Sequence, residues 1–282
     1  MSFHEAGPDE AAGIAAFLRT DPDWTMFPLS NLTHYGMGRE GRYQMRFWLK
    51  GQRLEAALGL SAMGMLLPYL PGLGADDLAP LRPLLEGEAI SGLIGPSEQA
   101  EALRAALGLR DSDAEHMDDE PGFALDLADL VLPDDPTIRL RSPDLRDMPL
   151  LVQWRAAYRG EVTATPPERR EAAAREDIET YIARDSHRIL EHDGTPVAMT
   201  GFNAELPEAV QIGGVYTPPA LRGRGHARAA VALHLADARR AGVRRAVLFA
   251  ANDAAARAYR AIGFQPNGRM TMILYRPGTR VA

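Results

Sequence analysis

Apolar residues recur at regular spacing through the second half of the chain and predict a clear series of elements. Leu151, Trp154 and Tyr158 fall on one face of a helix. The runs 187–191 and 195–203 flank a His-Asp-Gly turn, which predicts a hairpin. The predicted order is strand 137–141, helix 144–158, helix 166–184, strands 187–191, 195–203 and 210–216, helix 225–241, strand 245–250, helix 253–262 and strand 270–275.

This order of elements indicates a mixed α/β fold. A helix connects the fourth strand to the fifth, and such a crossover usually joins parallel strands. Tight turns join antiparallel neighbours. We therefore expect a mixed, mostly antiparallel sheet flanked by helices.

The first half of the chain is less regular but predicts a similar order. The predicted elements are helix 9–19, strands 43–49, 53–60 and 62–70, helix 76–85, strand 89–94 and helix 97–107. Because no sequence repeat is apparent, an internal duplication rests on this order alone.

A proline- and aspartate-rich stretch separates the two halves. Residues 131–141 read V-L-P-D-D-P-T-I-R-L-R, which cannot continue a helix or a central strand. A boundary near residue 136 gives domains 1–136 and 137–282, each of ordinary domain size.

Composition narrows the class of protein. The chain is 46% hydrophobic and 24% charged and has no cysteine, which excludes disulfide scaffolds, cysteine-ligated zinc, iron–sulfur clusters and thiol nucleophiles. The seven histidines lack a metal-ligand spacing, so we expect no metal. No apolar run approaches the ~20 residues of a membrane span, and residues 1–10 are acidic without a signal-peptide core. We expect a cytoplasmic protein, monomeric or homodimeric, without a membrane partner.

Charge is divided unevenly between the halves. Residues 1–136 carry 9 basic and 23 acidic side chains, a balance of −14, whereas residues 137–282 carry 22 and 15, a balance of +7. The second half therefore suits an anionic partner.

A glycine-rich loop precedes the alanine-rich helix of the second half. Residues 218–227 read P-P-A-L-R-G-R-G-H-A. Gly223 and Gly225 allow close approach of the backbone, and the helix start directs unpaired N–H groups into the same space. With Arg224 and Arg228 beside it, the loop favours a phosphate or pyrophosphate. It lacks the G-K-[ST] of a P-loop and the G-x-G-x-x-G of a dinucleotide site.

A second motif, N-D-A-A-A-R-A-Y-R-A-I-G-F, occupies residues 252–264. Asn252 ends an apolar strand, and Tyr259 follows two turns into the next helix on the same face. The two motifs together resemble the Gcn5-related N-acetyltransferase (GNAT) family. Its Q/R-x-x-G-x-G/A motif matches Arg222, Gly225 and Ala227, and its N-x-x-A-x-x-x-Y-x-x-x-G-F motif matches Asn252, Ala255, Tyr259, Gly263 and Phe264.

The resemblance covers about 137–282, and the first half resembles a degenerate second copy, as in tandem GNAT proteins. It implies transfer of an acetyl group from acetyl-CoA to a primary amine of a small molecule or peptide by direct attack. By analogy, Asn252 contacts pantetheine and Tyr259 donates a proton to the departing thiolate. The implied cofactor-binding residues are Val215, Tyr216, Thr217, Arg222, Gly223, Arg224, Gly225, His226, Ala227, Arg228, Asn252, Ala255 and Tyr259.

The position at which many family members carry a general base is occupied by Gln211. Many GNAT members place Glu on the fourth strand at the position of Gln211, and Gln cannot accept a proton. Nearby titratable residues are expected to be solvated hairpin residues; these are Glu205, Glu208, His187 and His192.

The acceptor is expected to bind beside the first two helices of the second half. The expected walls are Trp154, Tyr158, Val162 and Thr163, with Phe202 opposite. In the first half, the corresponding loop 68–77 carries Asp76 and Asp77 in place of arginines. These carboxylates would repel pyrophosphate, so one coenzyme per chain is expected.

Two other functions remain open. A non-catalytic acyl-CoA sensor is compatible with the missing base. A nucleic-acid binder is suggested by Arg239, Arg240, Arg244 and Arg245, but the chain is acidic overall and has no nucleic-acid-binding motif. We therefore expect no nucleic-acid partner.

Overall fold

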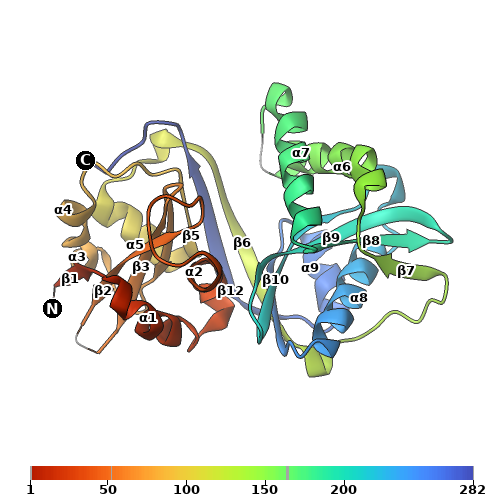
Figure 1. Cartoon of the computed structure of the whole chain (residues 1–282), viewed down its shortest axis with the longest axis horizontal. Helices are drawn as coiled ribbons and strands as arrows, with labels where there is room; N and C mark the ends of the chain where they lie inside the picture. Colours follow the sequence, from red (N-terminus) through yellow and green to blue (C-terminus); the bar gives the residue numbers. More distant parts are fainter. Residues whose placement is uncertain (1, 52, 163–164, 282) are drawn as a thin grey trace. The chain divides into compact units, whose positions relative to one another are not determined.

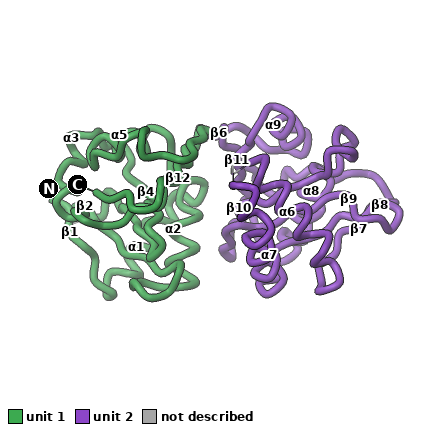
Figure 2. Tube along the Cα trace, turned by 90° about the horizontal axis from the view of Figure 1, so that it is seen from above, with its two compact units in different colours: residues 1–120, 268–282 green, residues 121–267 purple. Residues whose placement is uncertain are grey.

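The computed structural model describes residues 2–51, 53–162 and 165–281 (Figure 1). Thr163, one of the expected acceptor walls, lies outside the described residues. The chain divides into two compact units, unit 1 (Met1–Glu120 and Gly268–Ala282) and unit 2 (Pro121–Asn267), as Figure 2 shows.

Unit 2 contains a sheet in the order β7-β8-β9-β10-β11-β6. Neighbouring strands are antiparallel except β10 and β11, which are parallel and joined through α8. This confirms the mixed, mostly antiparallel sheet and the crossover helix. The elements are β7 (Ile138–Arg141), α6 (Met148–Val162), α7 (Pro167–Ala183), β8 (His187–His192), β9 (Thr195–Glu205), β10 (Ala209–Tyr216), α8 (His226–Arg240), β11 (Arg245–Phe249) and α9 (Asp253–Arg260), with the end of β6 (Ala114–Asp126).

Two faces of this sheet carry different helices. Helices α6 and α7 cover one face, where Trp154 and Ile178 pack with Met199 and Tyr216. Helix α8 covers the other face, where Ala230 packs with neighbouring strands (Figure 1). The side chains of β10 therefore pack on the α6–α7 face, as Tyr216 does, or on the α8 face, as Ile212 does.

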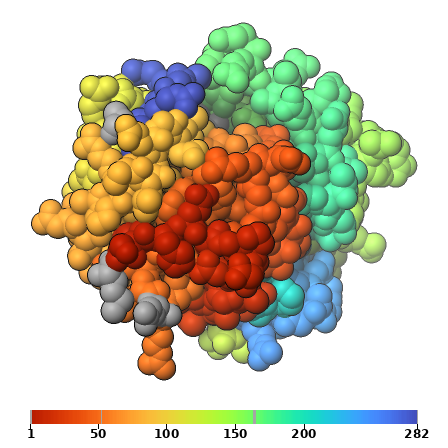
Figure 3. All heavy atoms as spheres, turned by 60° about the vertical axis from the view of Figure 1, so that its left-hand side comes forward, coloured from red at the N-terminus to blue at the C-terminus, as the bar shows by residue number. Residues whose placement is uncertain are grey.

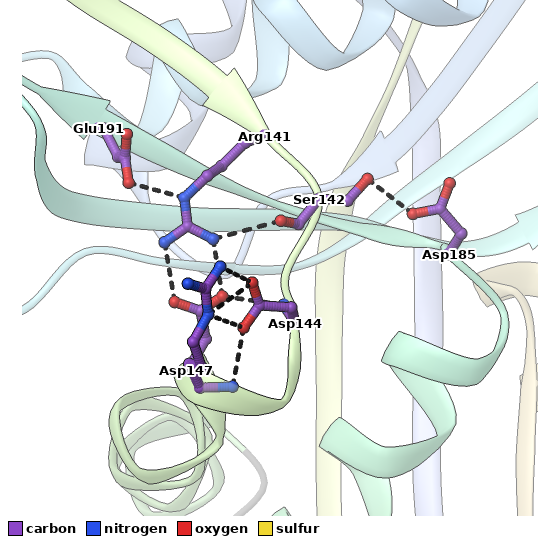
Figure 4. Close-up of polar contacts among 7 residues, drawn as sticks. Arg141, Ser142, Asp144, Asp147, Asp185 and Glu191 are labelled. Carbon is purple, nitrogen blue, oxygen red and sulfur yellow. Dashed lines mark hydrogen bonds and ion pairs between the residues drawn. The ribbon is translucent and has the colours of Figure 1, made fainter.

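The junction between β7 and α6 is held by ion pairs (Figure 4). Arg141 binds both carboxylate oxygens of Asp147, at 2.7 and 2.8 Å, and Glu191 at 2.6 Å. The carboxylate of Asp144 accepts from the N–H of Arg146, which caps the short turn before α6. The hydrogen bonds from Arg141 lower the pKa of the Asp147 carboxyl below its usual value. These contacts fix the start of α6 against the sheet.

Unit 1 has a sheet in the order β1-β2-β3-β4-β5-β12. Again one pair, β4 and β5, is parallel and follows a helical crossover. Figure 3 turns toward the reader a face built mainly from the first third of the chain, coloured red to yellow. The elements are β1 (Phe3–Glu5), α1 (Ala11–Leu18), α2 (Pro22–Tyr35), β2 (Met45–Lys50), β3 (Ala56–Ser61), β4 (Met65–Tyr69), α3 (Ala75–Leu78), α4 (Leu81–Leu85), β5 (Gly92–Pro96), α5 (Ser97–Leu107) and β12 (Gln265–Tyr275).

The two units share an order of elements, with their last strands exchanged. Strand β6 follows α5 of unit 1 but pairs with β11 of unit 2 through residues 122–126. Strand β12 follows α9 of unit 2 but pairs with β5 of unit 1 through residues 270–274. The chain passes from unit 1 to unit 2 between residues 120 and 121 and returns between residues 267 and 268; the sequence prediction had a single boundary near residue 136.

Several features of the first half differ from the sequence prediction, among them strand β1, which was not predicted. Helix α2 was not predicted, because Pro28 stands inside it. The expected helix 76–85 is two short helices, α3 and α4, on either side of Pro80. Strand β6 was missed because the acidic residues 115–120 resemble a loop. Among the described residues, no helix is long and apolar enough to cross a membrane.

Candidate active site

Strands β10 and β11 separate partway along their length. Pairing joins Ala209–Gln211 to Arg245–Val247, and no further pair between these strands occurs in the described residues. Beyond this point β10 slips in register against β9, and Gly214 adopts a φ of +63°, which favours glycine. The far end of β10 thus has backbone groups that β11 does not engage.

The loop after β10 ends in an open helix start. Gly225 caps α8 with a φ of +84° and offers no side-chain hydrogen bond to the first N–H groups of the helix. Arg224 and Arg228 are exposed, and neither forms an ion pair within the described part of the chain. Gly223 also has positive φ, at +78°. Free N–H groups, a helix dipole and two cations make this loop suitable for an anion.

Arg222 is engaged by the protein itself. Its Nε donates to the carbonyl of Thr217 at 2.9 Å, and its Nη2 lies 2.6 Å from the Glu161 carboxylate of α6. Its guanidinium lies 5.7 Å from the ring centre of Tyr216. Arg222 therefore fixes the loop to β10 and α6. Sequence reasoning did not identify Glu161, because its partner lies 61 positions away.

His226 and Ala227 form the first turn of α8. The His226 side chain is buried, and its ring centre lies 5.6 Å from that of His192. Burial, with smaller contributions from His192 and Arg224, lowers the pKa of His226. Its uncharged ring thus packs beneath the loop and leaves the adjacent backbone N–H groups in place.

The end of β10 contributes three side chains with different surroundings. Val215 is half-buried against the core on the α8 face. Tyr216 is buried with Trp154, and burial raises the pKa of its phenol. Thr217 is 9% exposed, and its Oγ1 has no hydrogen-bond partner among the described residues. That orphaned hydroxyl lies at the open end of the strand.

The motif after β11 forms the start of α9. Asn252 is exposed, and its Oδ1 accepts from the N–H of Ala255 at 2.9 Å, so it caps the helix. Ala255 is half-buried, and Tyr259 packs in the core with its ring centre 6.1 Å from that of Phe264. The sequence placed Asn252 and Tyr259 on consecutive elements, and the structure adds the capping role.

Gln211 lies at the last paired position of β10 and is 3% exposed. Its Nε2 donates to the carbonyl of Ile212 at 2.7 Å, while its Oε1 has no partner in the described residues. Its amide thus stands where β10 and β11 begin to separate. It can hold a water or a ligand, and it cannot take a proton.

Two expectations about neighbouring side chains are wrong. His187 is not a solvated hairpin residue: it is 4% exposed and stacks on Tyr181 of α7. Phe202 does not face Trp154: it packs on the α8 side, stacked at 3.8 Å on His234. Trp154 and Tyr158 do share the α6–α7 face. Successive residues of β9 alternate between the two faces of the sheet. Phe202 therefore faces α8, while Gly201, the partner of His187 on β8, lies on the α6–α7 face and leaves space for the imidazole.

The corresponding loop of unit 1 is closed by its own carboxylate. Gly74 precedes α3, a helix of only four residues, and Asp77 Oδ2 accepts from the N–H of Gly74 at 3.2 Å. Lys50 lies 3.7 Å from the other oxygen of Asp77. Within the described residues, strands β4 and β5 also stop pairing, after Leu66 and Leu93, but the ring of Pro68 lies in the gap: a Cβ added to Gly95 on β5 would be 2.5 Å from it.

Comparison with known proteins agrees with this geometry. Residues 150–264 match a family described as "Acetyltransferase (GNAT) family". A GNAT acetyltransferase structure from Colwellia psychrerythraea is 14% identical, with a TM-score of 0.59 and coverage of 98% of this chain and 100% of that one. A GCN5-related N-acetyltransferase from Sphaerobacter thermophilus is 19% identical, with a TM-score of 0.56 and coverage of 99% and 97%.

A third similar structure also spans both units. It is a tandem GNAT protein from the clavulanic acid biosynthesis pathway, 18% identical, with a TM-score of 0.54 and coverage of 99% of both chains. At these identities the structures show a shared fold. No curated protein matches the sequence at a significant level. Residues 150–264 of unit 2 therefore carry a domain of the acetyltransferase (GNAT) family, and the shared fold extends over both units.

Proposed function

We propose that unit 2 transfers an acetyl group from acetyl-CoA to a primary amine by direct attack. The observation that carries this proposal is the combination of a strand pair that separates beside an open helix start. The gap between β10 and β11 suits an extended chain, and the loop at its end suits phosphates.

From the start of α8 to Gln211, groups of the protein would bind successive parts of coenzyme A. Arg224, Arg228 and the N–H groups after Gly225 would hold the pyrophosphate. The orphaned hydroxyl of Thr217 and the free backbone of β10 would bind the amides of pantetheine. The unpartnered Oε1 of Gln211 would lie near the reacting end. These are groups that the protein leaves without partners of its own, which supports a ligand there.

Acetyl-CoA would supply the acyl group as a thioester. The C–N bond forms, the C–S bond breaks, and the electron pair of that bond leaves with sulfur. Tyr259 would donate the proton that sulfur takes up. Gln211 would hold a water that carries away the proton of the amine, since its amide accepts none.

Unit 1 would bind no coenzyme. Asp77 already accepts the N–H of Gly74 at the start of α3. Asp76 adds a second negative charge in the same turn. An anion there would meet two carboxylates beside a gap that the ring of Pro68 occupies. Unit 1 would then serve as a scaffold for unit 2.

Titration calorimetry with acetyl-CoA, followed by thiol release with a panel of primary amines, tests the proposal. We expect one site per chain and amine-dependent release. Two sites per chain would contradict the role given to unit 1. Absence of acetyl-CoA binding would overturn the proposal for unit 2.

A second candidate, favoured by Gln211 at the usual base position, is a non-catalytic acyl-CoA sensor. It would bind acetyl-CoA with the same stoichiometry and release no thiol above the uncatalysed rate with any amine. Rate against pH for Gln211→Glu and Gln211→Ala shows whether this position takes part: an unchanged profile for both removes it from the mechanism.

A further inference from the structure

His187 of β8 reaches across the sheet to the bulge of β10. It pairs with Gly201 of β9, and a side chain on Gly201 would place its Cβ 2.1 Å from His187 Nε2. A Cβ on Gly214 would lie 2.7 Å from the same atom. The two glycines therefore leave the space that the imidazole occupies. Nε2 lies beside the stretch of β10 that β11 has left.

The ring is held in one orientation. It stacks on Tyr181 with ring centres 3.4 Å apart and planes 8° apart. Its Nδ1 lies 3.0 Å from the Ser186 hydroxyl. Its Nε2 is buried and has no hydrogen-bond partner among the described residues. A buried polar atom without a partner is costly, and such atoms concentrate where a ligand completes them.

The surroundings keep the ring uncharged, and the three arginines near it are paired with carboxylates of the protein. Burial lowers the pKa of His187 well below its usual value, and positive charges add to this effect. The positive charges near it are Arg155 of α6, Arg184 at the end of α7 and Arg188 of β8. Tyr181 is a neutral neighbour with a raised pKa, and His234 is a second titratable group on the other face of the sheet. The Ser186 hydroxyl is able to donate to Nδ1, and in that tautomer the neutral ring carries its proton on Nε2 and offers it as a hydrogen-bond donor; we take the ring in this tautomer.

We propose that His187 donates a hydrogen bond from Nε2 to the carbonyl oxygen of the acyl group during transfer. This inference rests on the proposed function. As the amine attacks, the C–N bond forms and the carbonyl π electrons move to oxygen. They return when the C–S bond breaks and its electron pair leaves with sulfur. His187 keeps its proton throughout and stabilises the negative charge on oxygen.

Infrared spectroscopy of bound acetyl-CoA, labelled with ¹³C at the thioester carbonyl, tests this without any acceptor. The test pair is His187→Gln, which keeps an N–H donor, and His187→Met, which has similar length and none. In the wild-type chain the carbonyl band is expected at lower frequency than in water-free solvent. His187→Met should move it back, and His187→Gln should retain part of the shift.

His234 provides a matched control. It is also buried, stacks on Phe202 and has an unpartnered Nδ1, but it lies on the α8 face of the sheet. His234→Met should leave the carbonyl band where the wild-type chain has it. The thermal midpoint and the Kd for acetyl-CoA, measured for every variant, separate a lost contact from lost folding.

Kinetics give the second measurement. His187→Met should lower kcat about 100-fold, the effect typical of one lost oxyanion donor, with an unchanged KM for acetyl-CoA and an unchanged shape of the pH profile. An unshifted carbonyl band, an unaltered kcat, or loss of one limb of the pH profile would each overturn the inference. If acetyl-CoA binds, the wild-type band is shifted and no amine is acetylated, the proposed function fails while the contact stands.

Discussion

The two loops that follow the fourth strand of each unit have opposite chemistry at the same place in the fold. In unit 2, Gly225 opens a helix of 15 residues whose first N–H groups have no side-chain cap. In unit 1, Gly74 opens a helix of four residues, and Asp77 already accepts the N–H of Gly74. The loop of unit 2 leaves N–H groups that can donate to a ligand, whereas in unit 1 the N–H of Gly74 already donates to Asp77.

The space between the strands beside these loops also differs between the two units. The pairing of β10 with β11 stops after three residues, and the bulge at Gly214 turns the rest of β10 away. In unit 1 the ring of Pro68 packs against Gly95 across the corresponding gap. On the proposed function, a few residues distinguish the unit that binds from the unit that does not: Asp77 at the loop and Pro68 in the gap.

The largest expected effect comes from giving unit 2 the charges of unit 1. Arg224→Asp with Arg228→Asp removes two charge-assisted contacts, worth about 3 kcal/mol together, so the Kd for acetyl-CoA should rise roughly 150-fold. Calorimetry measures it. Arg169→Asp with Arg175→Asp, on the exposed face of α7, changes net charge equally and is the control. If both double variants raised the Kd for acetyl-CoA equally, the effect would come from net charge and not from contacts in the loop.

Tyr259→Phe should have the next largest effect. Removing the phenol while keeping the packed ring should lower kcat about 50-fold, a little below the usual contribution of a general acid because a thiolate leaves readily. The Kd for acetyl-CoA and the thermal midpoint should stay near wild-type values. A kcat equal to the wild-type value would show that sulfur takes its proton from elsewhere.

Acid should destabilise unit 2 through its buried imidazoles. Burial lowers the pKa of His234 to about 3 and that of His187 well below its usual value. The folded chain then binds fewer protons than the unfolded chain, so stability is fully present above pH 6.5 and is lost as the pH falls below it. Each imidazole should contribute a slope of about 1.4 kcal/mol per pH unit.

Denaturant unfolding between pH 7 and pH 5 measures this slope. His234→Phe should reduce it by about 1.4 kcal/mol per pH unit, the contribution of one proton. Hydrogen exchange of peptides from each unit shows where stability is lost, because the buried imidazoles His187, His226 and His234 all lie in unit 2. An unchanged slope in His234→Phe would show that this ring does not titrate on unfolding.

The smallest expected effect is the reverse exchange of charges. Asp76→Arg with Asp77→Arg gives unit 1 the charges of unit 2 and should leave the stoichiometry at one acetyl-CoA per chain. The reason is geometric, since α3 stays short and Pro68 still fills the gap. Calorimetry that returned two sites would show that charge alone separates the loops.

Local patterns predicted much of unit 2. The hairpin at Asp193, the crossover helix and the glycine at the start of α8 follow from turn residues and helical spacing. Burial of His187 could not be predicted, because the space for its ring comes from glycines on two other strands. The pairing of β6 was equally hidden, since its acidic first half obscures the apolar residues that meet β11.

The exchange of last strands has a consequence for synthesis on the ribosome. β5 of unit 1 is complete roughly 170 residues before the strand that pairs with it, a delay of about 10 to 35 s at usual rates of translation. Through that interval one edge of β5 lacks its partner and can pair with other chains. The sheet of unit 1, although it is made first, is therefore completed only when the last strand of the chain has been synthesised.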